Sequence, residues 1–295
     1  MSIVRVTGGV DTHADVHVAA AVDHNGGVLG IESFDADTAG YENLLGWLTG
    51  FGPVDLVGVE GTGSYGVELA RFLTAVGVGV VEVDRPNRQT RRKVGKSDPV
   101  DAVSAARAAL SGTAVVIPKG RNGPMEQMRV LLVARRSARH QRIQTLNQLR
   151  QLVFTAPEPI RIRFKDRYKT GLVNEAAAMR PRQGSDPVLF TTNMVIRNLA
   201  RRVKALNVEM RAIDHALLTL IGDAAPSLLE LHGVGPDTAA SLLVTAGDNP
   251  ERLRSERSWA ALCGVTPIPA SSGKVTRYRL NRGGDRNANA ALYRI

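Results

Sequence analysis

Two aspartates stand three residues apart in the segment "KSDPVDA" (96–102), and acidic side chains at that spacing could do metal chemistry. Residues i and i+3 share one face of a helix, so Asp98 and Asp101 could both reach one divalent cation. The same residues also suit a helix N-terminus, with Asp98 as the cap, Pro99 as the first helical residue and Asp101 in the first turn. The local sequence leaves both interpretations open.

Two more acids follow predicted strands in the same part of the chain: Asp11 in "GGVDTHAD" and Glu60 in "VGVEGTGSYG". Ligands gather at strand ends of α/β sheets, so the four carboxylates could converge at one edge and bind Mg²⁺, or Mn²⁺ in its place. Two such ions would stabilise the attacking and leaving oxygens of a phosphoryl transfer. Taken singly, Asp11 and Glu60 are also typical of ordinary strand-end acids. His13 or His17, on or beside the first hairpin, could supply a third metal ligand, although the pattern favours surface histidines.

The elements that must position these acids form an α/β pattern. Apolar runs predict strands at 3–10, 16–23, 28–35, 54–60 and 76–84. Helices are predicted at 38–51, 64–75 and 98–111. Asn25-Gly26 is a hairpin-turn signal between two of the strands. The order is a β-hairpin followed by alternating elements, which indicates a mixed sheet in an α/β fold.

Charge is distributed unevenly along the 295 residues, whose net charge is +10. Residues 1–84 hold 12 acids and two basic residues, whereas residues 129–169 hold 11 Lys/Arg and two acids. The basic part favours a polyanion partner, nucleic acid above all, although a solvated helix face would have the same composition. Arg91, Arg92 and Lys96 stand next to the two aspartates and could hold a phosphate backbone.

Other classes of protein are disfavoured by composition. Cys263 is the only cysteine, so an internal disulfide and a cysteine-based zinc cluster are excluded, and a small buried side chain is expected. The N-terminus lacks a signal-peptide pattern and no apolar run approaches membrane-spanning length, so we expect a cytoplasmic protein without a membrane partner. With aromatics at 4%, contacts to nucleic-acid backbones are favoured over base stacking.

From about residue 124 the pattern becomes helical. Apolar residues recur at alternating spacings of three and four: Ile196, Leu199, Val203, Leu206, Met210, Ile213, Leu217 and Leu220. This heptad seam predicts either an antiparallel helix pair within the chain or a dimerising coiled coil, and the two are compatible.

The last section carries two motifs. "LHGVGPDTAASLL" (231–243) has the form of a helix-hairpin-helix, whose turn at Gly233, Val234 and Gly235 could bind a phosphate or simply connect two helices. "ASSGKVTRYRLNRGGDR" (270–286) puts Ser271 and Ser272 beside a basic cluster: Lys274, Arg277, Arg279, Arg282 and Arg286. From the residues alone this segment is typical of a flexible phosphate-binding loop.

Together, "VDTHADVHVAA", "VEGTGSYG", "KSDPVDAVSAARA", "LHGVGPDTAASLL" and "CGVTPIPASSGKVTRYRLNRGGDRNANAALY" resemble the successive motifs of the IS110 insertion-sequence transposases of DEDD type. The resemblance covers about 1–111 and 226–295, and members of that family often continue past "RNANAALY". It implies a RuvC-like domain of the ribonuclease H-like fold at 1–115, a helical coiled-coil connector at 116–222, and a mainly α transposase domain at 223–295.

The resemblance also implies the chemistry. The Mg²⁺-binding carboxylates would be Asp11, Glu60, Asp98 and Asp101. Ser272, with Ser271 as the neighbouring alternative, would attack DNA and form a phosphoserine intermediate. The partners would be donor and target DNA, a guide (bridge) RNA and further copies of the chain in a dimer or tetramer. A RuvC-like nuclease without a serine intermediate is the main alternative; an actin-like kinase or ATPase and a non-catalytic DNA-binding protein are more distant ones.

Overall fold

The computed structural model describes residues 5–83, 97–167, 170–182 and 186–295, which fall into two compact units. Unit 1 comprises the chain up to Asn122 together with Gly247–Arg254, and unit 2 comprises Gly123–Ala246 and Ser255–Ile295. The predicted phosphate contacts Arg91, Arg92 and Lys96 lie outside the described residues. No helix in the described part of the chain has the length and apolar character needed to cross a membrane.

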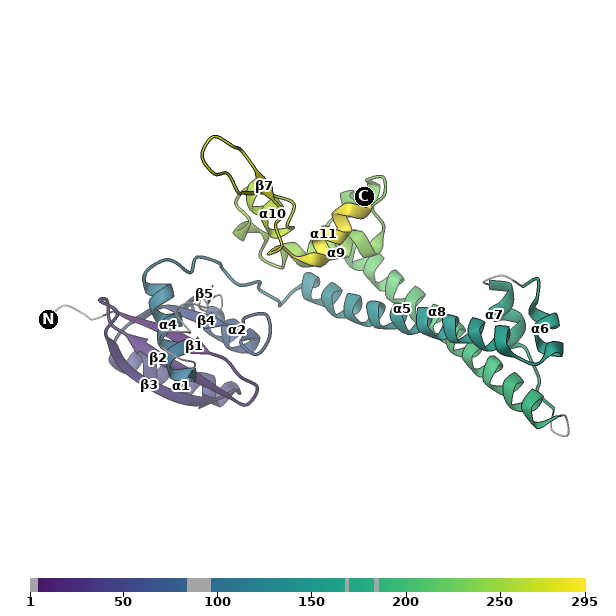
Figure 1. Cartoon of the computed structure of the whole chain (residues 1–295). Helices are drawn as coiled ribbons and strands as arrows, with labels where there is room; N and C mark the ends of the chain where they lie inside the picture. Colours follow the sequence, from purple (N-terminus) through teal and green to yellow (C-terminus); the bar gives the residue numbers. More distant parts are fainter. Residues whose placement is uncertain (1–4, 84–96, 168–169, 183–185) are drawn as a thin grey trace. The chain divides into compact units, whose positions relative to one another are not determined.

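Unit 1 is built on a mixed five-stranded sheet in the order β3-β2-β1-β4-β5 (Figure 1). Its strands are β1 (Val6–Asp11), β2 (Val16–Val22), β3 (Val28–Asp35), β4 (Val54–Glu60) and β5 (Gly79–Val83). Strand β2 runs antiparallel to its two neighbours β1 and β3, whereas β1, β4 and β5 are parallel to one another. The predicted α/β class with a mixed sheet is therefore confirmed.

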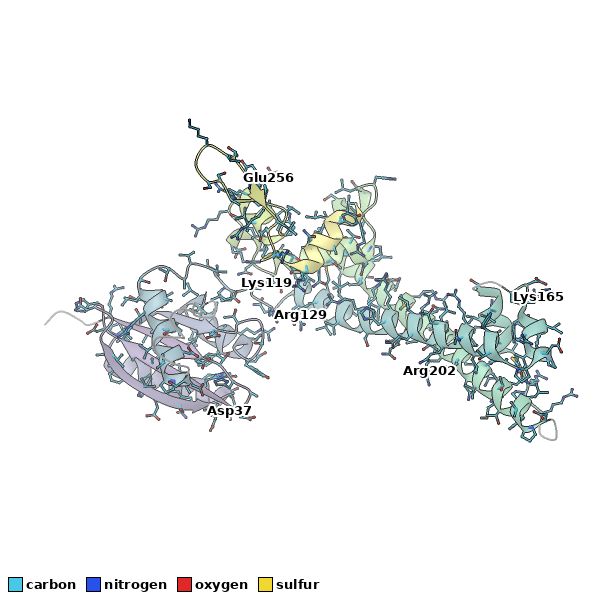
Figure 2. All side chains as sticks on the ribbon, in the orientation of Figure 1. Asp37, Lys119, Arg129, Lys165, Arg202 and Glu256 are labelled. Carbon is cyan, nitrogen blue, oxygen red and sulfur yellow. The ribbon has the colours of Figure 1, made fainter. Side chains whose placement is uncertain are left out.

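Helices cover both faces of this sheet, because alternate residues of the central strands point to opposite sides. Helices α1 (Thr38–Phe51) and α2 (Val67–Ala75) pack on one face, against a core that includes Ala19 and Ala21. Helix α4 (Asp98–Leu110) packs on the other face, against Val18 and Ala20. Asp37, labelled in Figure 2, caps α1 by accepting a hydrogen bond from the Gly40 N–H at 2.8 Å.

Helix α4 lies unusually close to the sheet, and two glycines make this possible. A Cβ atom on Gly9 of β1 would lie 2.0 Å from the backbone nitrogen of Ala106, and one on Gly58 of β4 would lie 2.6 Å from the carbonyl oxygen of Ala105. Neither distance is tolerable for a side chain. The glycines thus bring the start of α4 next to the carboxyl end of β1, which sets the position of the acidic residues.

We expect Gly9→Ala to destabilise unit 1, since its methyl group would collide with helix backbone. Overpacking of this kind costs about 1–3 kcal/mol. The control is Gly46→Ala in α1, where a Cβ meets nothing within 4 Å and where alanine should add about 0.5–1 kcal/mol of stability. Urea unfolding followed by circular dichroism measures both. Equal effects of the two substitutions would contradict the close packing of α4.

Unit 2 contains a long helical pair, α5 (Pro124–Thr155) and α8 (Pro187–Ala224), with α6 (Glu158–Phe164) and α7 (Thr170–Ala177) between them in sequence. Arg135 of α5 contacts Asp214 of α8, and Arg142, one heptad later in α5, contacts Asn207, one heptad earlier in α8. The two helices are therefore antiparallel. The intramolecular pair predicted from the heptad seam is confirmed, and its buried members include Ile196, Val203, Leu206, Ile213 and Leu217.

The remainder of unit 2 is mainly helical. It contains the 3-10 helix η1 (Pro226–Glu230), the helices α9 (Pro236–Ala246), α10 (Glu256–Leu262) and α11 (Arg286–Arg294), and a two-stranded hairpin of β6 (Ile268–Pro269) and β7 (Tyr278–Arg279). Another 3-10 helix, η2 (Pro250–Arg252), belongs to unit 1. Cys263 is fully buried with Leu242, Ala288 and Ala291, as expected for a small apolar side chain.

Candidate active site

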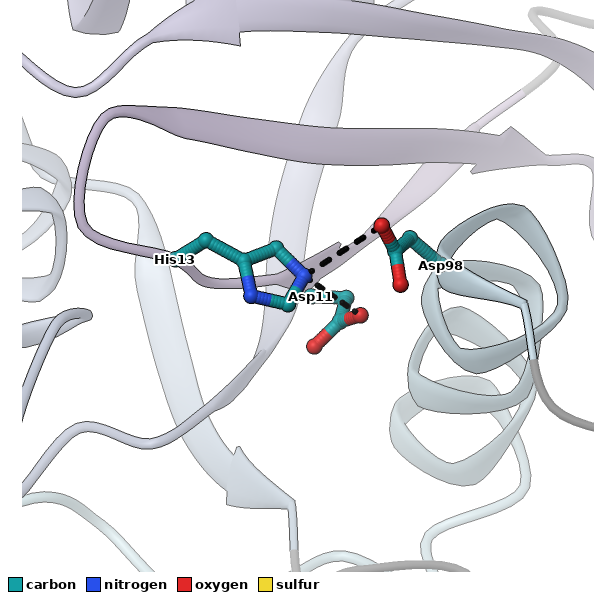
Figure 3. A group of neighbouring side chains, drawn as sticks. All are labelled: Asp11, His13 and Asp98. Atoms are coloured by element: carbon teal, nitrogen blue, oxygen red, sulfur yellow. Dashed lines mark ion pairs between the residues drawn. The ribbon is translucent and has the colours of Figure 1, made fainter.

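Three potential metal ligands meet where β1 ends and α4 begins (Figure 3). The Nε2 atom of His13 lies 3.2 Å from Oδ2 of Asp11 and 3.5 Å from Oδ2 of Asp98. The ligand atoms of these three residues all lie within 4.8 Å of one another. The structure thus brings together two of the four predicted carboxylates and adds a histidine.

The other two predicted carboxylates surround this group. Asp101 is buried, with 4% of its surface exposed, and its charge acts on Asp11. Glu60 ends the strand next to β1, and the pairing of Val10 with Val59 places it beside Asp11 in the register. The ligand group identified among the described residues nevertheless consists of Asp11, His13 and Asp98, without Glu60 or Asp101.

The charges of the other residues at this site act on the carboxyl group of Asp11. Burial raises the pKa of this carboxyl group; the nearby His13 lowers it in part, and the charges of Asp101 and Asp98 raise it further. An ionised Asp11 is therefore unfavourable in the protein alone. A positive charge at the same place would relieve both the desolvation and the repulsion between carboxylates.

The two predicted surface histidines differ in exposure: the His13 side chain is 45% exposed, whereas His17 is buried. His13 Nε2 is buried and makes no hydrogen bond to any described residue, although it faces two carboxylates. His17 is fully buried and stacks on Tyr41, with 5.7 Å between the ring centroids. Its Nδ1 atom accepts a hydrogen bond from the His13 backbone N–H at 3.3 Å, and burial lowers its pKa, so it is a neutral residue that supports the β1–β2 turn.

The start of α4 differs by one residue from the predicted cap. The helix begins at Asp98, not Pro99, and Ser97 occupies the cap position without a side-chain hydrogen bond. The Asp101 backbone N–H donates to the Ser97 carbonyl at 3.0 Å, which closes the first turn. The Asp98 carboxylate lies 3.5 Å from Nε2 of His13, and the Asp101 side chain is buried one turn later.

The serine segment joins β6 to β7 in unit 2, and both serines are exposed. The Ser271 hydroxyl accepts a hydrogen bond from the Arg277 backbone N–H at 3.1 Å and lies 3.4 Å from the Arg277 carbonyl. The Ser272 hydroxyl has no such partner in the described part of the chain, and only its backbone pairs with Val275. The predicted cations on this loop, Lys274, Arg277, Arg279 and Arg282, are all exposed.

The base of this loop is fixed by a second glycine contact. A Cβ on Gly284 would lie 2.3 Å from the Cα of Gly264, which itself has φ +70, so glycine is required at both positions. Asn289 adds a hydrogen bond to the Cys263 carbonyl at 3.2 Å. The serine loop therefore projects from a tightly packed base.

The predicted helix-hairpin-helix at 231–243 is not confirmed, although a turn there joins two helical elements. Helix α9 starts at Pro236 as expected, but the preceding element is the 3-10 helix η1 instead of a full α-helix. Gly233 has φ +82, whereas the Val234 side chain is buried and its N–H donates to the Leu231 carbonyl at 3.1 Å. Gly235 follows at an open position where a Cβ would meet nothing within 4 Å.

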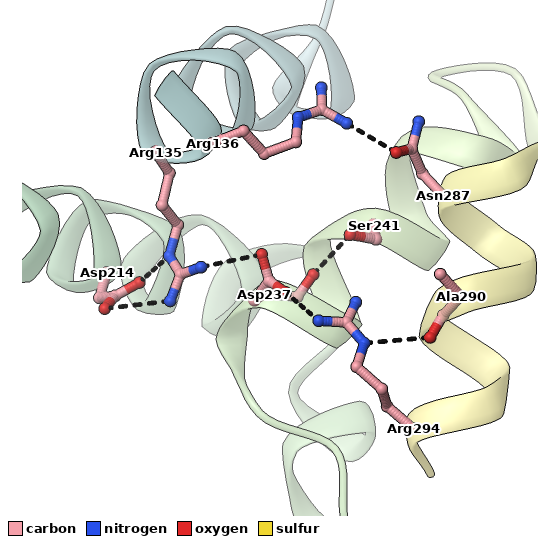
Figure 4. A network of polar contacts seen from close by, with 8 residues as sticks. All are labelled: Arg135, Arg136, Asp214, Asp237, Ser241, Asn287, Ala290 and Arg294. Carbon is pink, nitrogen blue, oxygen red and sulfur yellow. Dashed lines mark hydrogen bonds and ion pairs between the residues drawn. The ribbon is translucent and has the colours of Figure 1, made fainter. Parts of the chain in front are cut away.

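Charged side chains hold this hairpin in place (Figure 4). Arg135 Nε lies 2.5 Å from Asp214, and its NH1 atom lies 3.0 Å from Asp237 in the first turn of α9. Arg294 of α11 contacts the other oxygen of Asp237 at 2.6 Å, and Arg136 contacts Asn287 at 2.8 Å. Asp237 therefore joins α5, α9 and α11, and the side chain of Arg135 is only 17% exposed.

We expect Arg135→Ala to lower the free energy of unfolding by about 1.5–3 kcal/mol, because it leaves two half-buried carboxylates without their shared cation. Arg139→Ala is the control, since Arg139 is exposed on the same helix and has no partner among the described residues; its effect should stay within about 0.5 kcal/mol. Chemical denaturation of both variants measures the difference. A loss as small as that of the control would show that Arg135 is not a structural cation.

Sequence reasoning favoured a surface histidine over a third metal ligand for His13, and it missed the contacts of Arg135. A signal for His13 exists: it stands two residues after Asp11, and residues i and i+2 of an extended chain lie on one side. Arg135 gives no local signal, because its partner Asp237 lies 102 residues away in sequence.

Comparison with known proteins gives the family. A family model described as "Transposase", for DEDD transposases of the IS110 type, matches residues 8–156, about half of the chain. A second, described as "Transposase IS116/IS110/IS902 family", matches residues 225–295. The "Insertion element IS110 uncharacterized 43.6 kDa protein" of Streptomyces coelicolor is 31% identical over 110 residues, which is 36% of this chain and 27% of that relative. From these matches, the chain belongs to the IS110 family of transposases.

Proposed function

We propose that this chain is the DNA-cutting and rejoining enzyme of an insertion sequence, acting with a carboxylate metal site and a serine nucleophile. The observation that carries the proposal is the meeting of Asp11, His13 and Asp98 at the junction of β1 and α4. A buried acid whose pKa is raised by burial and by neighbouring carboxylates, as for Asp11, is costly for the fold, and such groups cluster at functional sites. The site matches the chemistry that the transposase family requires.

The residues present fit a divalent cation, for which we propose Mg²⁺, with Mn²⁺ as a substitute. Asp11 and Asp98 offer oxygen ligands, and His13 offers a buried nitrogen that has no hydrogen-bond partner among the described residues. Glu60 and Asp101 would complete the acidic shell, as in the DEDD pattern. A bound cation would stabilise the charge that develops on a phosphodiester during its displacement.

Ser272 is the proposed nucleophile. Its hydroxyl is exposed and bonded to no described residue, whereas the Ser271 hydroxyl is held by the backbone of Arg277. The Ser272 oxygen would attack phosphorus, form a phosphoserine bond and release a deoxyribose hydroxyl that takes up a proton. Attack of a second DNA hydroxyl on that phosphoserine would restore Ser272 and join the strands. Each step exchanges one phosphate ester bond for another, so the reaction needs no external energy source.

The nucleic-acid partners follow from charge. We propose that Lys274, Arg277, Arg279 and Arg282, in the same segment as the serine, neutralise phosphates, as would Arg91, Arg92 and Lys96, which precede Asp98 in the sequence. The Gly233–Gly235 turn would contact phosphate through its backbone N–H groups. Because the chain has few aromatics for reading bases, we propose that a guide (bridge) RNA selects donor and target DNA by pairing. We propose three parts: a RuvC-like domain (1–115), a connector (116–222) and a transposase domain (223–295). Within a dimer or tetramer, the carboxylates of the first part would act together with the serine of the third.

The alternative function is metal-dependent DNA cleavage by the same carboxylates without a serine intermediate. An assay that combines the protein, its copurifying RNA and paired DNA substrates with Mg²⁺ separates the two. The proposal predicts joined DNA products that require the RNA. Cleaved ends without joined products would favour the nuclease, and products of equal yield without RNA would contradict guidance.

A further inference from the structure

A basic pocket with an exposed phenyl ring lies where α5 ends beside α6 and α7. Its volume is about 460 Å³, within the range of ligand sites, and it is lined by Arg150, Val153, Phe154, Arg161, Phe164, Lys165, Arg167 and Leu172. Phe154 is 77% exposed, whereas Phe164 and Leu172 are buried and form an apolar floor. Lys165, labelled in Figure 2, stands at this end of the helical pair.

Three of the pocket's cations are free to bind a ligand. Arg150, Arg161 and Lys165 are exposed, and none of them has an ion pair or hydrogen bond to a residue within the described ranges. Arg167 differs, because its Nε atom lies 2.7 Å from Glu175. Among the described residues, no acidic side chain lines the pocket. Three uncompensated positive charges therefore surround one exposed aromatic ring, which is the combination that an anion with a flat apolar face would match.

We propose that this pocket binds an unpaired nucleotide of an RNA loop, with its base stacked on Phe154 and its phosphates held by Arg150, Arg161 and Lys165. The proposal deepens the proposed function, on which it rests, by assigning a binding site for the guide RNA. RNA recognition commonly uses unstacked loop bases on aromatic side chains, with cations along the backbone.

Duplex backbones alone do not account for the pocket. A regular helix of RNA or DNA presents phosphates but no exposed base face, so it would use the cations and leave Phe154 in water. An acidic peptide would likewise gain nothing specific from the ring. The ring and the cations are used together only by a strand whose bases are unpaired.

The test measures binding of labelled nucleic acids to the full-length chain by fluorescence anisotropy. The probes are an RNA stem-loop with an unpaired loop, the same stem as a blunt RNA duplex, and a DNA stem-loop of the same sequence. We expect Phe154→Ala to weaken binding of the RNA stem-loop by roughly 5- to 150-fold, the range of one base-stacking contact. Its affinity for the blunt duplex should change by less than about twofold, and Phe154→Trp should restore loop binding.

Matched variants make the result specific. Ile162→Ala removes an apolar side chain that is 65% exposed on α6 but does not line the pocket, and it should leave loop binding unchanged. Arg150→Gln should weaken binding of the RNA stem-loop and reduce the dependence of affinity on salt concentration. Arg139→Gln, on the same helix but outside the pocket, should weaken this binding less than Arg150→Gln does. Circular dichroism verifies that each variant is folded.

The outcomes separate this inference from the function on which it rests. If the wild-type chain binds no RNA probe, the guide-RNA function fails. If the wild type binds the loop and Phe154→Ala binds it as well as Ile162→Ala does, the pocket assignment fails and the function stands. Equal binding of the DNA stem-loop, with the same loss in Phe154→Ala, would overturn the assignment to RNA.

Discussion

Asp11→Asn is expected to abolish DNA strand exchange and, at the same time, to raise the melting temperature of the metal-free protein. Activity should fall by about a thousandfold or more, because the charge stabilisation that a bound cation supplies is worth several kcal/mol. The gain in stability arises because burial and the charges of Asp101 and Asp98 raise the pKa of Asp11, so its ionised form is less favourable than that of an exposed aspartate. An amide removes that charge with little change in shape.

The sign of the pH dependence follows from the raised pKa of Asp11. A carboxyl group whose folded-state pKa is raised stabilises the fold when protonated, and this contribution is lost as the pH rises through that pKa. The difference in melting temperature between Asp11→Asn and the wild type should therefore be largest at pH 7 and should vanish below the ordinary aspartate pKa of about 4.

The matched control is Asp15→Asn, because Asp15 is exposed in the same turn. It should change neither activity nor melting temperature. Mg²⁺ should raise the melting temperature of the wild type and of Asp15→Asn more than that of Asp11→Asn, since only a site with its ligands intact gains stability from the ion. An Asp11→Asn variant that melts below the wild type in EDTA would contradict the electrostatic description of the cluster.

Ser272→Ala should remove the covalent protein–DNA adduct and all strand exchange, whereas Ser271→Ala should keep both. Loss of a nucleophile can reduce a rate by up to about 10⁶-fold. The two serines are adjacent, exposed and part of the same basic segment, so this pair isolates the hydroxyl itself. The expected difference rests on geometry: the Ser271 hydroxyl is bonded to the Arg277 backbone, and the Ser272 hydroxyl is bonded to no described residue.

Both variants should retain DNA and RNA binding, because neither removes a charge. Denaturing gels of the reaction with labelled DNA detect the adduct. An adduct that persists in Ser272→Ala and disappears in Ser271→Ala would show that the neighbouring serine is the nucleophile. Cleavage without an adduct in the wild type would instead support the nuclease alternative.

Much of unit 1 could be predicted from the sequence because its elements have clear hydrophobic periods. The bounds of α1 and β4 match the prediction residue for residue. At two of the places where prediction and structure differ, a glycine turn comes first: α2 begins at Val67, after a turn in which Gly61 has φ +73, and β5 begins at Gly79, after Gly77 with φ +84. A local apolar pattern cannot show where such turns end.

The candidate site was less predictable, because it depends on contacts between distant segments. The four acids could be selected from strand ends and a helix start, but the closeness of α4 to β1 depends on Gly9 and Gly58, which carry no side chain to reveal it. The participation of His13 depends on the shape of a short turn. The pairing of Arg135 with Asp237 requires that α5 and α9 pack together, which no local period encodes.

The most direct test of the proposed reaction is to map the covalent adduct in the intact protein. The protein, its copurifying RNA and target DNA are incubated with Mg²⁺, digested, and analysed by mass spectrometry for a nucleotide-bearing peptide. The proposed function predicts a nucleotide on Ser272 when Mg²⁺ is present and none when EDTA replaces it or when Asp11→Asn is used. DNA that is cleaved with Mg²⁺ while no serine of the 270–286 segment carries a nucleotide would contradict it.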